Sequence, residues 1–115
     1  MEAILNKTKK YLIVRLKGEL DDHAAAGMRQ TLKDLLERYP DYSLLLNLKD
    51  LSFIDSSGVG VILGRYREMT REERDIALCC LNSQVRRVLG LAGILKIIPS
   101  FGSEKEALNQ GRFAQ

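Results

Sequence analysis

A carboxylate, two hydroxyls and a glycine stand side by side in the segment Asp55-Ser56-Ser57-Gly58. A leucine-rich run ends just before this segment, and an amphipathic helical pattern begins just after it. We therefore expect the serines at a strand-to-helix turn, where unpaired backbone N–H groups and the helix dipole create a partial positive charge. Such a position suits an anion, including a phosphate carried by a serine hydroxyl.

A plainer interpretation is that these residues only cap a helix, with one side chain accepting hydrogen bonds from the first turn. The neighbouring residues favour a docking role as well, because Val59 and Leu63 continue from the turn and Gly58 and Gly60 expose backbone around them. A phosphate here adds about −1.5 to −2 charges beside Asp55. The helix dipole offsets this charge by roughly 0.3 to 1 kcal/mol within the fold. Burying an unpaired dianion at an interface costs several kcal/mol. The pattern therefore predicts a surface that binds a partner only when it is unphosphorylated, in a domain that stays folded in both forms.

Catalytic and metal-binding sites find little support in the sequence. His23 is the sole histidine and lies beside two aspartates at a predicted helix start. A histidine at such a position is more often a solvent-exposed residue of the helix cap than a general base. Neither Ser56 nor Ser57 fits the G-x-S-x-G pattern of a hydrolase nucleophile. One histidine, two adjacent cysteines and scattered carboxylates do not form a metal-ligand set. We predict no catalytic residue, no metal and no cofactor.

Nucleotide binding is the alternative function that the glycines leave open. Gly58, Gly60 and Gly64 begin a helical pattern, as glycines do in loops that bind phosphates. Their spacing differs from G-x-G-x-x-G, and Arg65 and Tyr66 stand where a phosphate-binding loop has Lys and Ser or Thr. The sequence therefore gives this alternative weak support.

Length and composition indicate one ordinary domain spanning residues 1–115, with 45% hydrophobic and 29% charged residues. The net charge is +3, the basic residues are scattered and Trp is absent, which disfavours direct binding of nucleic acid. No apolar run approaches the roughly 18 residues of a membrane-spanning helix, and the N-terminus does not resemble a signal peptide. We expect a soluble cytoplasmic protein without membrane contact.

Hydrophobic periodicity predicts the elements that hold the serine turn. Strands are expected at residues 3–5, 11–16 (ended by Gly18), 44–48, 76–81 and 95–98. Helices are expected from Asp21 or Asp22 to Pro40, from the serine turn through Met69, from Asn82 or Ser83 to Gly90, and from Ser103 onward. Cys79 and Cys80, as strand neighbours, should face opposite sides and remain unpaired.

The order β-β-α-β-α-β-α-β-α predicts a single α/β domain. Its sheet is expected to be mixed and five-stranded, with an antiparallel N-terminal hairpin, mostly parallel remaining strands and four helices.

Three stretches closely resemble the anti-sigma factor antagonists, which are stand-alone STAS domains of endospore-forming bacteria and their relatives. These stretches are G-E-L-D at 18–21, L-N-L at 46–48 and L-S-F-I-D-S-S-G-V-G-V-I-L-G-R-Y at 51–66. The similarity runs over essentially the whole chain and is greatest to the sporulation members of the family. The resemblance implies a sheet covered mainly on one side by helices, and a regulatory rather than an enzymatic role. Related STAS modules of stress-response or transporter complexes are the remaining alternatives within the resemblance.

In the family, the unphosphorylated antagonist binds an anti-sigma factor, which is also a serine kinase holding ATP or ADP, and so frees the sporulation sigma factor F. The kinase then phosphorylates a serine of the Asp-Ser-Ser-Gly motif and ends the binding, and a serine phosphatase restores it. By position, the resemblance implies Ser56 as the phosphorylated residue, with Ser57 as the alternative. The implied partner-binding residues are Asp21, Asp55, Ser57, Gly58, Val59, Gly60 and Leu63.

Overall fold

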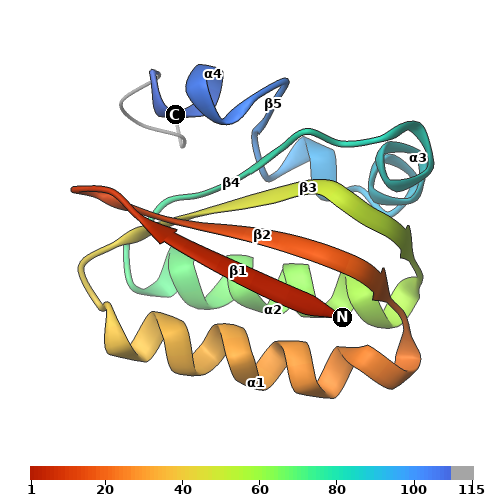
Figure 1. The fold of residues 1–115 in the computed structure, drawn as a ribbon, viewed down its shortest axis with the longest axis horizontal. Helices are drawn as coiled ribbons and strands as arrows, with labels where there is room; N and C mark the ends of the chain where they lie inside the picture. Colours follow the sequence, from red (N-terminus) through yellow and green to blue (C-terminus); the bar gives the residue numbers. More distant parts are fainter. Residues whose placement is uncertain (110–115) are drawn as a thin grey trace.

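The computed structural model describes residues 1–109, and its elements follow the predicted order. The strands are β1 (Glu2–Lys7), β2 (Tyr11–Leu20), β3 (Ser43–Ile54), β4 (Ile76–Cys79) and β5 (Ser100–Phe101). The helices are α1 (Asp22–Arg38), α2 (Ser56–Arg71), α3 (Ser83–Leu91), the 3₁₀ helix η1 (Ile94–Lys96) and α4 (Glu104–Leu108). The sheet order is β1-β2-β3-β4-β5, with β1 antiparallel to β2 and the other pairs parallel. The predicted α/β fold is confirmed (Figure 1).

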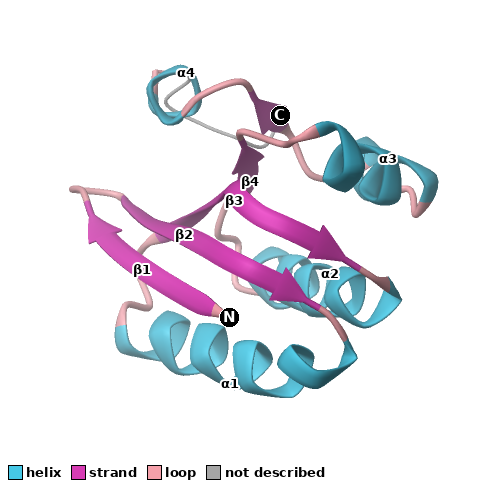
Figure 2. Ribbon diagram, turned by 45° about the vertical axis from the view of Figure 1, so that its right-hand side comes forward, coloured by secondary structure: helices cyan, strands magenta, loops and turns pink. Residues whose placement is uncertain are grey.

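Helices cover the two faces of the sheet unequally, with α1 and α2 on one face and the short α4 on the other (Figures 1 and 2). The alternation of β2 explains this division, because successive strand residues point to opposite faces. Leu12, Val14 and Leu16 pack in the large hydrophobic cluster with α1 and α2. Tyr11 and Ile13 pack in a smaller cluster that includes Ala107 of α4. Most of the buried apolar surface thus lies between the sheet and the two long helices.

The central strand β3 is longer than the predicted strand at residues 44–48. Those five residues are all buried, as expected for a strand covered on both faces. The strand continues to Ile54, which pairs with Leu20 at the end of β2. This extension carries β3 directly to the serine turn.

The predicted strand at residues 95–98 is wrong. Residues 95 and 96 lie in η1 instead, residues 97 and 98 follow in a turn, and the last strand lies at Ser100–Phe101. Gly93 adopts a left-handed backbone with φ 81°, which starts a local turn rather than an extended chain. The backbone N–H of Ile98 then donates to the carbonyl of Ile94 at 2.9 Å, and both side chains are buried. The apolar composition of this run favours a strand, but the burial of Ile94 and Ile98 follows a helical spacing.

Two other boundaries differ from prediction because of single residues with positive φ. Gly18, at φ 115°, lies within a β-bulge, so β2 continues to Leu20 instead of ending at Gly18. Cys80, at φ 63°, lies beyond the end of β4, which stops at Cys79. This conformation places Cys80 against the same small cluster as Cys79, rather than on the opposite face. Both thiols are free, as predicted.

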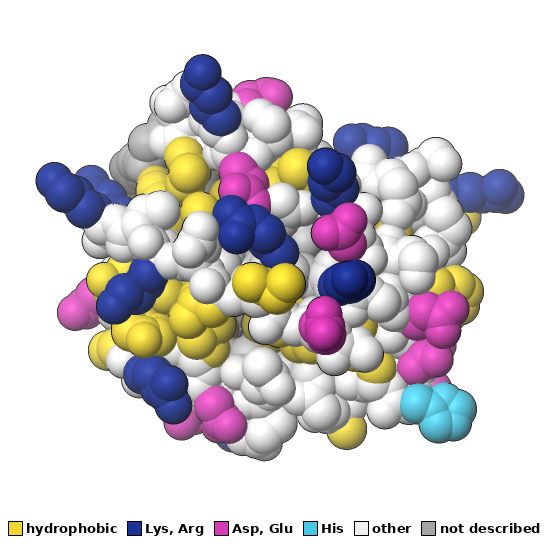
Figure 3. Space-filling model, viewed as in Figure 1, with side chains coloured by type: hydrophobic (Ala, Val, Ile, Leu, Met, Phe, Trp, Pro, Cys, Tyr) yellow, Lys and Arg dark blue, Asp and Glu magenta, His cyan; other side chains and the backbone are white. Residues whose placement is uncertain are grey.

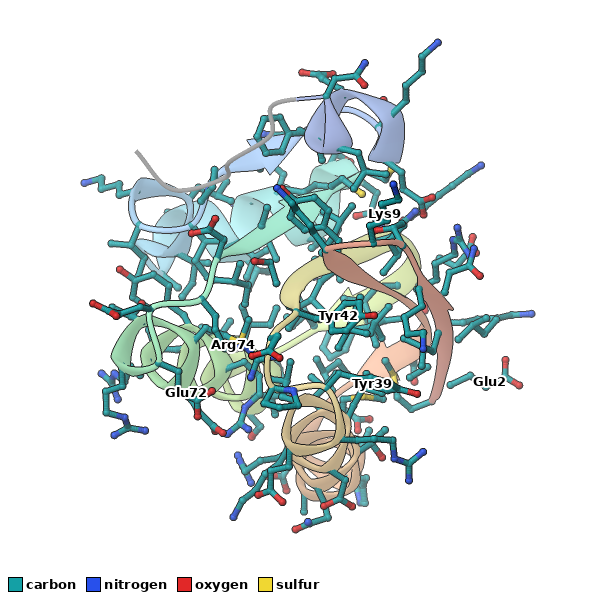
Figure 4. All side chains as sticks on the ribbon, turned by 90° about the vertical axis from the view of Figure 1, so that its left-hand side faces the viewer. Glu2, Lys9, Tyr39, Tyr42, Glu72 and Arg74 are labelled. Atoms are coloured by element: carbon teal, nitrogen blue, oxygen red, sulfur yellow. The ribbon has the colours of Figure 1, made fainter. Side chains whose placement is uncertain are left out.

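Arg74 ties the end of α1 to the loop that follows α2, and Figure 4 shows it directed toward Tyr39 and Tyr42. Its guanidinium donates to three backbone carbonyls, those of Tyr42 at 2.7 Å, Tyr39 at 2.8 Å and Leu36 at 3.2 Å. Glu72 pairs with the same group at 2.9 Å. The last carbonyls of a helix have no hydrogen-bond donor within the helix, so the Arg74 guanidinium provides the donors from outside.

A bidentate ion pair holds α4 on the outer face of the sheet. Arg15 of β2 contacts the two carboxylate oxygens of Glu104 at 2.7 and 2.8 Å, and the Asn47 amide of β3 donates to Oε2 at 2.6 Å. Hydrogen bonding from Arg15, with a smaller contribution from Asn47, lowers the pKa of the Glu104 carboxyl from its usual value of 4.5, although burial opposes this shift.

We expect acid to weaken this attachment. Because the pKa of Glu104 is lower in the folded protein than in the unfolded chain, its contribution to stability is complete above pH 4.5 and is lost as pH falls through the lowered folded pKa. Glu104→Gln should therefore lower the thermal unfolding temperature near neutral pH. Its difference from the wild type should shrink as the pH is lowered below 4.5. Melting curves recorded by circular dichroism at several pH values test this, and a difference that stays constant down to acid pH would contradict it.

Candidate functional site

The serine turn lies where two parallel strands end side by side. Leu20 at the end of β2 pairs with Ile54 at the end of β3, and each strand is followed at once by an aspartate. Asp21 precedes the first residue of α1, and Asp55 precedes the first residue of α2. The N-termini of the two long helices therefore meet at one edge of the sheet (Figure 2).

Each aspartate caps its helix. Asp21 Oδ1 accepts from the N–H groups of His23 and Ala24, both at 3.0 Å. Asp55 Oδ1 accepts from the N–H groups of Ser57 at 2.9 Å and Gly58 at 3.2 Å. Of the two caps that the sequence allowed for α1, Asp21 is therefore the one used. Both carboxylates have a structural role, because they satisfy backbone donors that the helices leave unpaired.

A second set of hydrogen bonds links the two helix starts to each other. Asp55 Oδ2 accepts from the backbone N–H of Asp22 at 3.1 Å. The Ser57 hydroxyl donates to Asp22 Oδ1 at 3.1 Å. This role of Asp22 was not predicted from the sequence, which indicated the residue only as a possible helix cap. The only sequence signal is a second acceptor immediately after the capping aspartate.

The two serines consequently have different surroundings. Ser56, the first residue of α2, is exposed, and its hydroxyl has no hydrogen-bond partner within residues 1–109. Ser57 is half-buried, with its backbone N–H on Asp55 and its hydroxyl on Asp22. The hydroxyl that stands free in solvent is that of Ser56.

The glycines after the serines also differ in their surroundings. Gly58 is buried, and a Cβ added to it would lie 2.4 Å from the Leu20 carbonyl oxygen and 2.7 Å from Ile54 Cγ1. Gly60 is exposed, and a Cβ there would meet nothing within 4 Å. Gly58 thus lets α2 begin close against the strand ends, whereas Gly60 leaves open space on the outer side of the helix.

Val59 and Leu63 are the apolar residues predicted for the partner-binding surface. Both are half-buried and pack against the large hydrophobic cluster, so each divides its surface between core and solvent. The structure therefore brings Asp21, Asp55 and Ser57 together where the N-termini of α1 and α2 meet, which we call the helix junction. From this junction a partly apolar strip, formed by Val59 and Leu63 beside the exposed Gly60, continues along α2.

The charge around the junction is acidic. Figure 3 shows acidic side chains gathered at the right-hand edge of the molecule, where Figure 1 places the starts of α1 and α2. A hollow of about 520 Å³ beside α1 is lined by Met1, Gly18, Glu19, Asp21, His23 and Ala24. Glu19 and Asp21 would repel the phosphates of a nucleotide, so this hollow does not favour the nucleotide alternative.

His23 is exposed at the start of α1, where its backbone N–H donates to Asp21. Within the described residues 1–109, no group of three or more His, Cys, Asp or Glu side chains is arranged to hold a metal ion. In the same part of the chain, no helix has the length and apolar character needed to cross a membrane.

Comparisons with known proteins agree with this fold. A family model described as the STAS domain matches residues 2–107. The anti-sigma F factor antagonist of Paenibacillus polymyxa is 41% identical over 99 residues, covering 86% of this chain and 85% of the relative. The anti-sigma-B factor antagonist of Bacillus subtilis is 32% identical over 85 residues, covering 74% of this chain and 76% of the relative.

A solved structure of the anti-sigma factor antagonist SpoIIAA in its unphosphorylated form superposes with a TM-score of 0.79 at 30% identity, covering 96% of each chain. The expected resemblance to the sporulation antagonists is thereby confirmed. The matched family model includes both capped helix starts and the whole serine turn. The chain belongs to the STAS domain family, and its relatives include the anti-sigma factor antagonists.

Proposed function

We propose that this protein is an anti-sigma factor antagonist whose binding is switched by phosphorylation of Ser56. The unphosphorylated form binds an anti-sigma factor and releases the sporulation sigma factor F. The protein acts as a regulator and as a kinase substrate rather than as an enzyme. The similarity to the anti-sigma F factor antagonist of Paenibacillus polymyxa over 86% of the chain supports this assignment.

The observation that carries the switch is the exposed hydroxyl of Ser56 at the start of α2, beside the capping carboxylate of Asp55. A phosphate there projects into solvent, and the helix dipole partly offsets its charge, by roughly 0.3 to 1 kcal/mol. A partner seated on this surface would instead have to bury the dianion beside Asp21 and Asp55. The fold therefore tolerates a group that the complex excludes.

The proposed partner surface joins the helix junction to the outer side of α2. Its residues are Asp21, Asp55, Ser57, Gly58, Val59, Gly60 and Leu63. Gly58 is buried, so it would act by holding its neighbours in place, whereas Gly60 lets a partner approach the helix backbone. The exposed parts of Val59 and Leu63 would supply the apolar contact.

The partners that this proposal requires are an anti-sigma factor with serine kinase activity, bound to ATP or ADP, and a serine phosphatase. Such a cycle takes place in the cytoplasm and needs no direct contact with nucleic acid or membrane. The regulatory unit would be the single STAS domain of residues 1–115.

The test is to incubate the protein with an anti-sigma F factor and magnesium ATP, and to map phosphate by peptide mass spectrometry. We expect a single phosphate, located on Ser56. Phosphate found only outside residues 55–58 would contradict the proposal.

An anti-sigma-B factor antagonist is the second candidate, because the Bacillus subtilis relative with that name is 32% identical. Titration of the protein against an anti-sigma F factor and an anti-sigma-B factor under the same conditions separates the two. Tighter binding to the anti-sigma F factor is the expected result, and a preference for the anti-sigma-B factor would favour the second candidate.

A further inference from the structure

Two adjacent serines offer a kinase two similar hydroxyls, and the fold distinguishes between them. We propose that Asp22 determines which serine is phosphorylated, by holding the hydroxyl of Ser57 and leaving that of Ser56 free. Asp22 is thus a positioning residue for the phosphorylation reaction. This inference rests on the proposed function, in which a kinase modifies the serine turn.

The contacts that carry the inference join three residues across the helix junction. The Ser57 hydroxyl donates to Asp22 Oδ1 at 3.1 Å, and the backbone N–H of Ser57 donates to Asp55 Oδ1 at 2.9 Å. Asp55 Oδ2 in turn accepts from the backbone N–H of Asp22 at 3.1 Å. Ser57 is therefore fixed through both its backbone and its side chain, and it is half-buried. Ser56, which is exposed, has no comparable restraint among the described residues.

The difference between the two hydroxyls affects the rate of phosphoryl transfer to each serine. The serine oxygen must attack the γ-phosphorus in line with the bond to the leaving ADP, while its proton passes to a carboxylate base of the kinase. In the balanced step, the serine O–H bond and the bond from the γ-phosphorus to ADP break, and the serine O–P bond forms. The Ser57 proton is already donated to Asp22, so transfer to Ser57 would first break that hydrogen bond.

Electrostatics adds a second penalty at Ser57. A phosphate on Ser57 would be attached to the hydroxyl oxygen that lies 3.1 Å from Asp22 Oδ1. The negative charges of the phosphate and of the Asp22 carboxylate would repel each other. Ser56 points into solvent from the first position of the helix, where water screens its phosphate. Both terms favour Ser56, and both depend on Asp22.

The experiment compares four proteins, namely Ser56→Ala, the double variants Ser56→Ala/Asp22→Ala and Ser56→Ala/Asp22→Asn, and the wild type. Each is incubated with an anti-sigma F factor and magnesium ATP, and phosphate on Ser57 is measured by peptide mass spectrometry. A hydrogen bond to a charged group is strong enough to alter a rate about tenfold. We therefore expect Ser57 phosphorylation to be slow in Ser56→Ala and at least about tenfold faster once Asp22 is alanine.

The asparagine variant serves as the rescue, because its amide oxygen still accepts from Ser57 while the charge is gone. It should keep Ser57 slow, closer to Ser56→Ala than to the alanine double variant. A general loss of structure on replacing Asp22 would change the Ser57 rate in the alanine and asparagine double variants alike, whereas loss of the hydrogen bond should change it only in the alanine double variant. Rapid phosphorylation of Ser57 in Ser56→Ala with Asp22 intact would overturn the inference while leaving the proposed function standing.

A thermal double-mutant cycle tests the same contact without a kinase. Ser57→Ala should lower the unfolding temperature of the wild type and should have little effect in the Asp22→Ala background. Equal effects in both backgrounds would overturn the inference. A wild type that takes no phosphate would instead defeat the proposed function, and the role of Asp22 with it, so the two failures are distinguishable.

Discussion

We expect replacement of Ser56 by aspartate to lower the affinity for an anti-sigma factor by at least about 100-fold, which is about 3 kcal/mol. The physical reason is that a partner on the proposed surface must bury the new charge beside the carboxylates of Asp21 and Asp55. The free protein keeps the new side chain in solvent at a helix N-terminus, where acidic residues are favourable. The unfolding temperature should therefore change by less than about 3 °C. Isothermal titration calorimetry measures the affinity, and circular dichroism measures the unfolding temperature.

Ser83 provides a matched control for this substitution. It is the exposed first residue of α3 and follows a capping residue, Asn82, just as Ser56 follows Asp55. Ser83→Asp places the same charge at an equivalent helix position outside the proposed surface. It should bind the anti-sigma factor as the wild type does. An equal loss of affinity in the two variants would mean that net charge, rather than the serine turn, governs binding.

We expect replacement of Gly58 by alanine to destabilise the protein by about 3 kcal/mol, at the upper end of the usual cost of overpacking. The added methyl group would lie 2.4 Å from the Leu20 carbonyl oxygen and 2.9 Å from Leu20 Cγ. The carbonyl belongs to the end of β2 and cannot rotate away, so α2 must shift from the strand ends. A loss of about 10 °C in unfolding temperature is expected, measured by calorimetry or circular dichroism.

Gly60→Ala is the control, because it makes the same substitution two residues later where a Cβ meets nothing within 4 Å. Alanine is the better helix former, so this variant should gain about 0.5 to 1 kcal/mol of stability. Equal stability of the two variants would show that the close approach at Gly58 does not constrain the fold.

Local chemistry allowed much of the fold to be predicted from the sequence. Asp21 and Asp55 cap helices because short acceptor side chains before an apolar periodic pattern satisfy the first N–H groups. Ser103 caps α4 in the same way, accepting from the N–H of Glu106 at 3.0 Å. These assignments need only neighbouring residues, which a single sequence supplies.

The boundaries that failed depend on contacts from elsewhere in the chain. The segment at residues 95–98 has the apolar composition of a strand, but it runs from η1 into a turn, and Ile94 and Ile98 are buried while Ile97 is exposed. The bulge at Gly18 and the left-handed Cys80 likewise depend on tertiary context that no short pattern reports. At these positions tertiary packing outweighs the secondary-structure propensity of the local sequence.

The same limit applies to the serine turn. The sequence indicates an exposed anion-tolerant turn at residues 55–58, but it gives no reason from the residues themselves to prefer Ser56 to Ser57. In the structure the two serines differ because the Ser57 hydroxyl donates to Asp22, which lies 35 residues away in sequence. Only the parallel pairing of β2 with β3 brings the two helix starts together.

We expect a phosphate on Ser56 to be compatible with the fold and incompatible with the complex. The most direct measurement is the affinity of one anti-sigma factor for the unphosphorylated protein and for the protein phosphorylated on Ser56, determined by isothermal titration calorimetry. We expect phosphorylation to lower the affinity by at least about 100-fold and to leave the circular dichroism spectrum unchanged. Equal affinity of the two forms would contradict it.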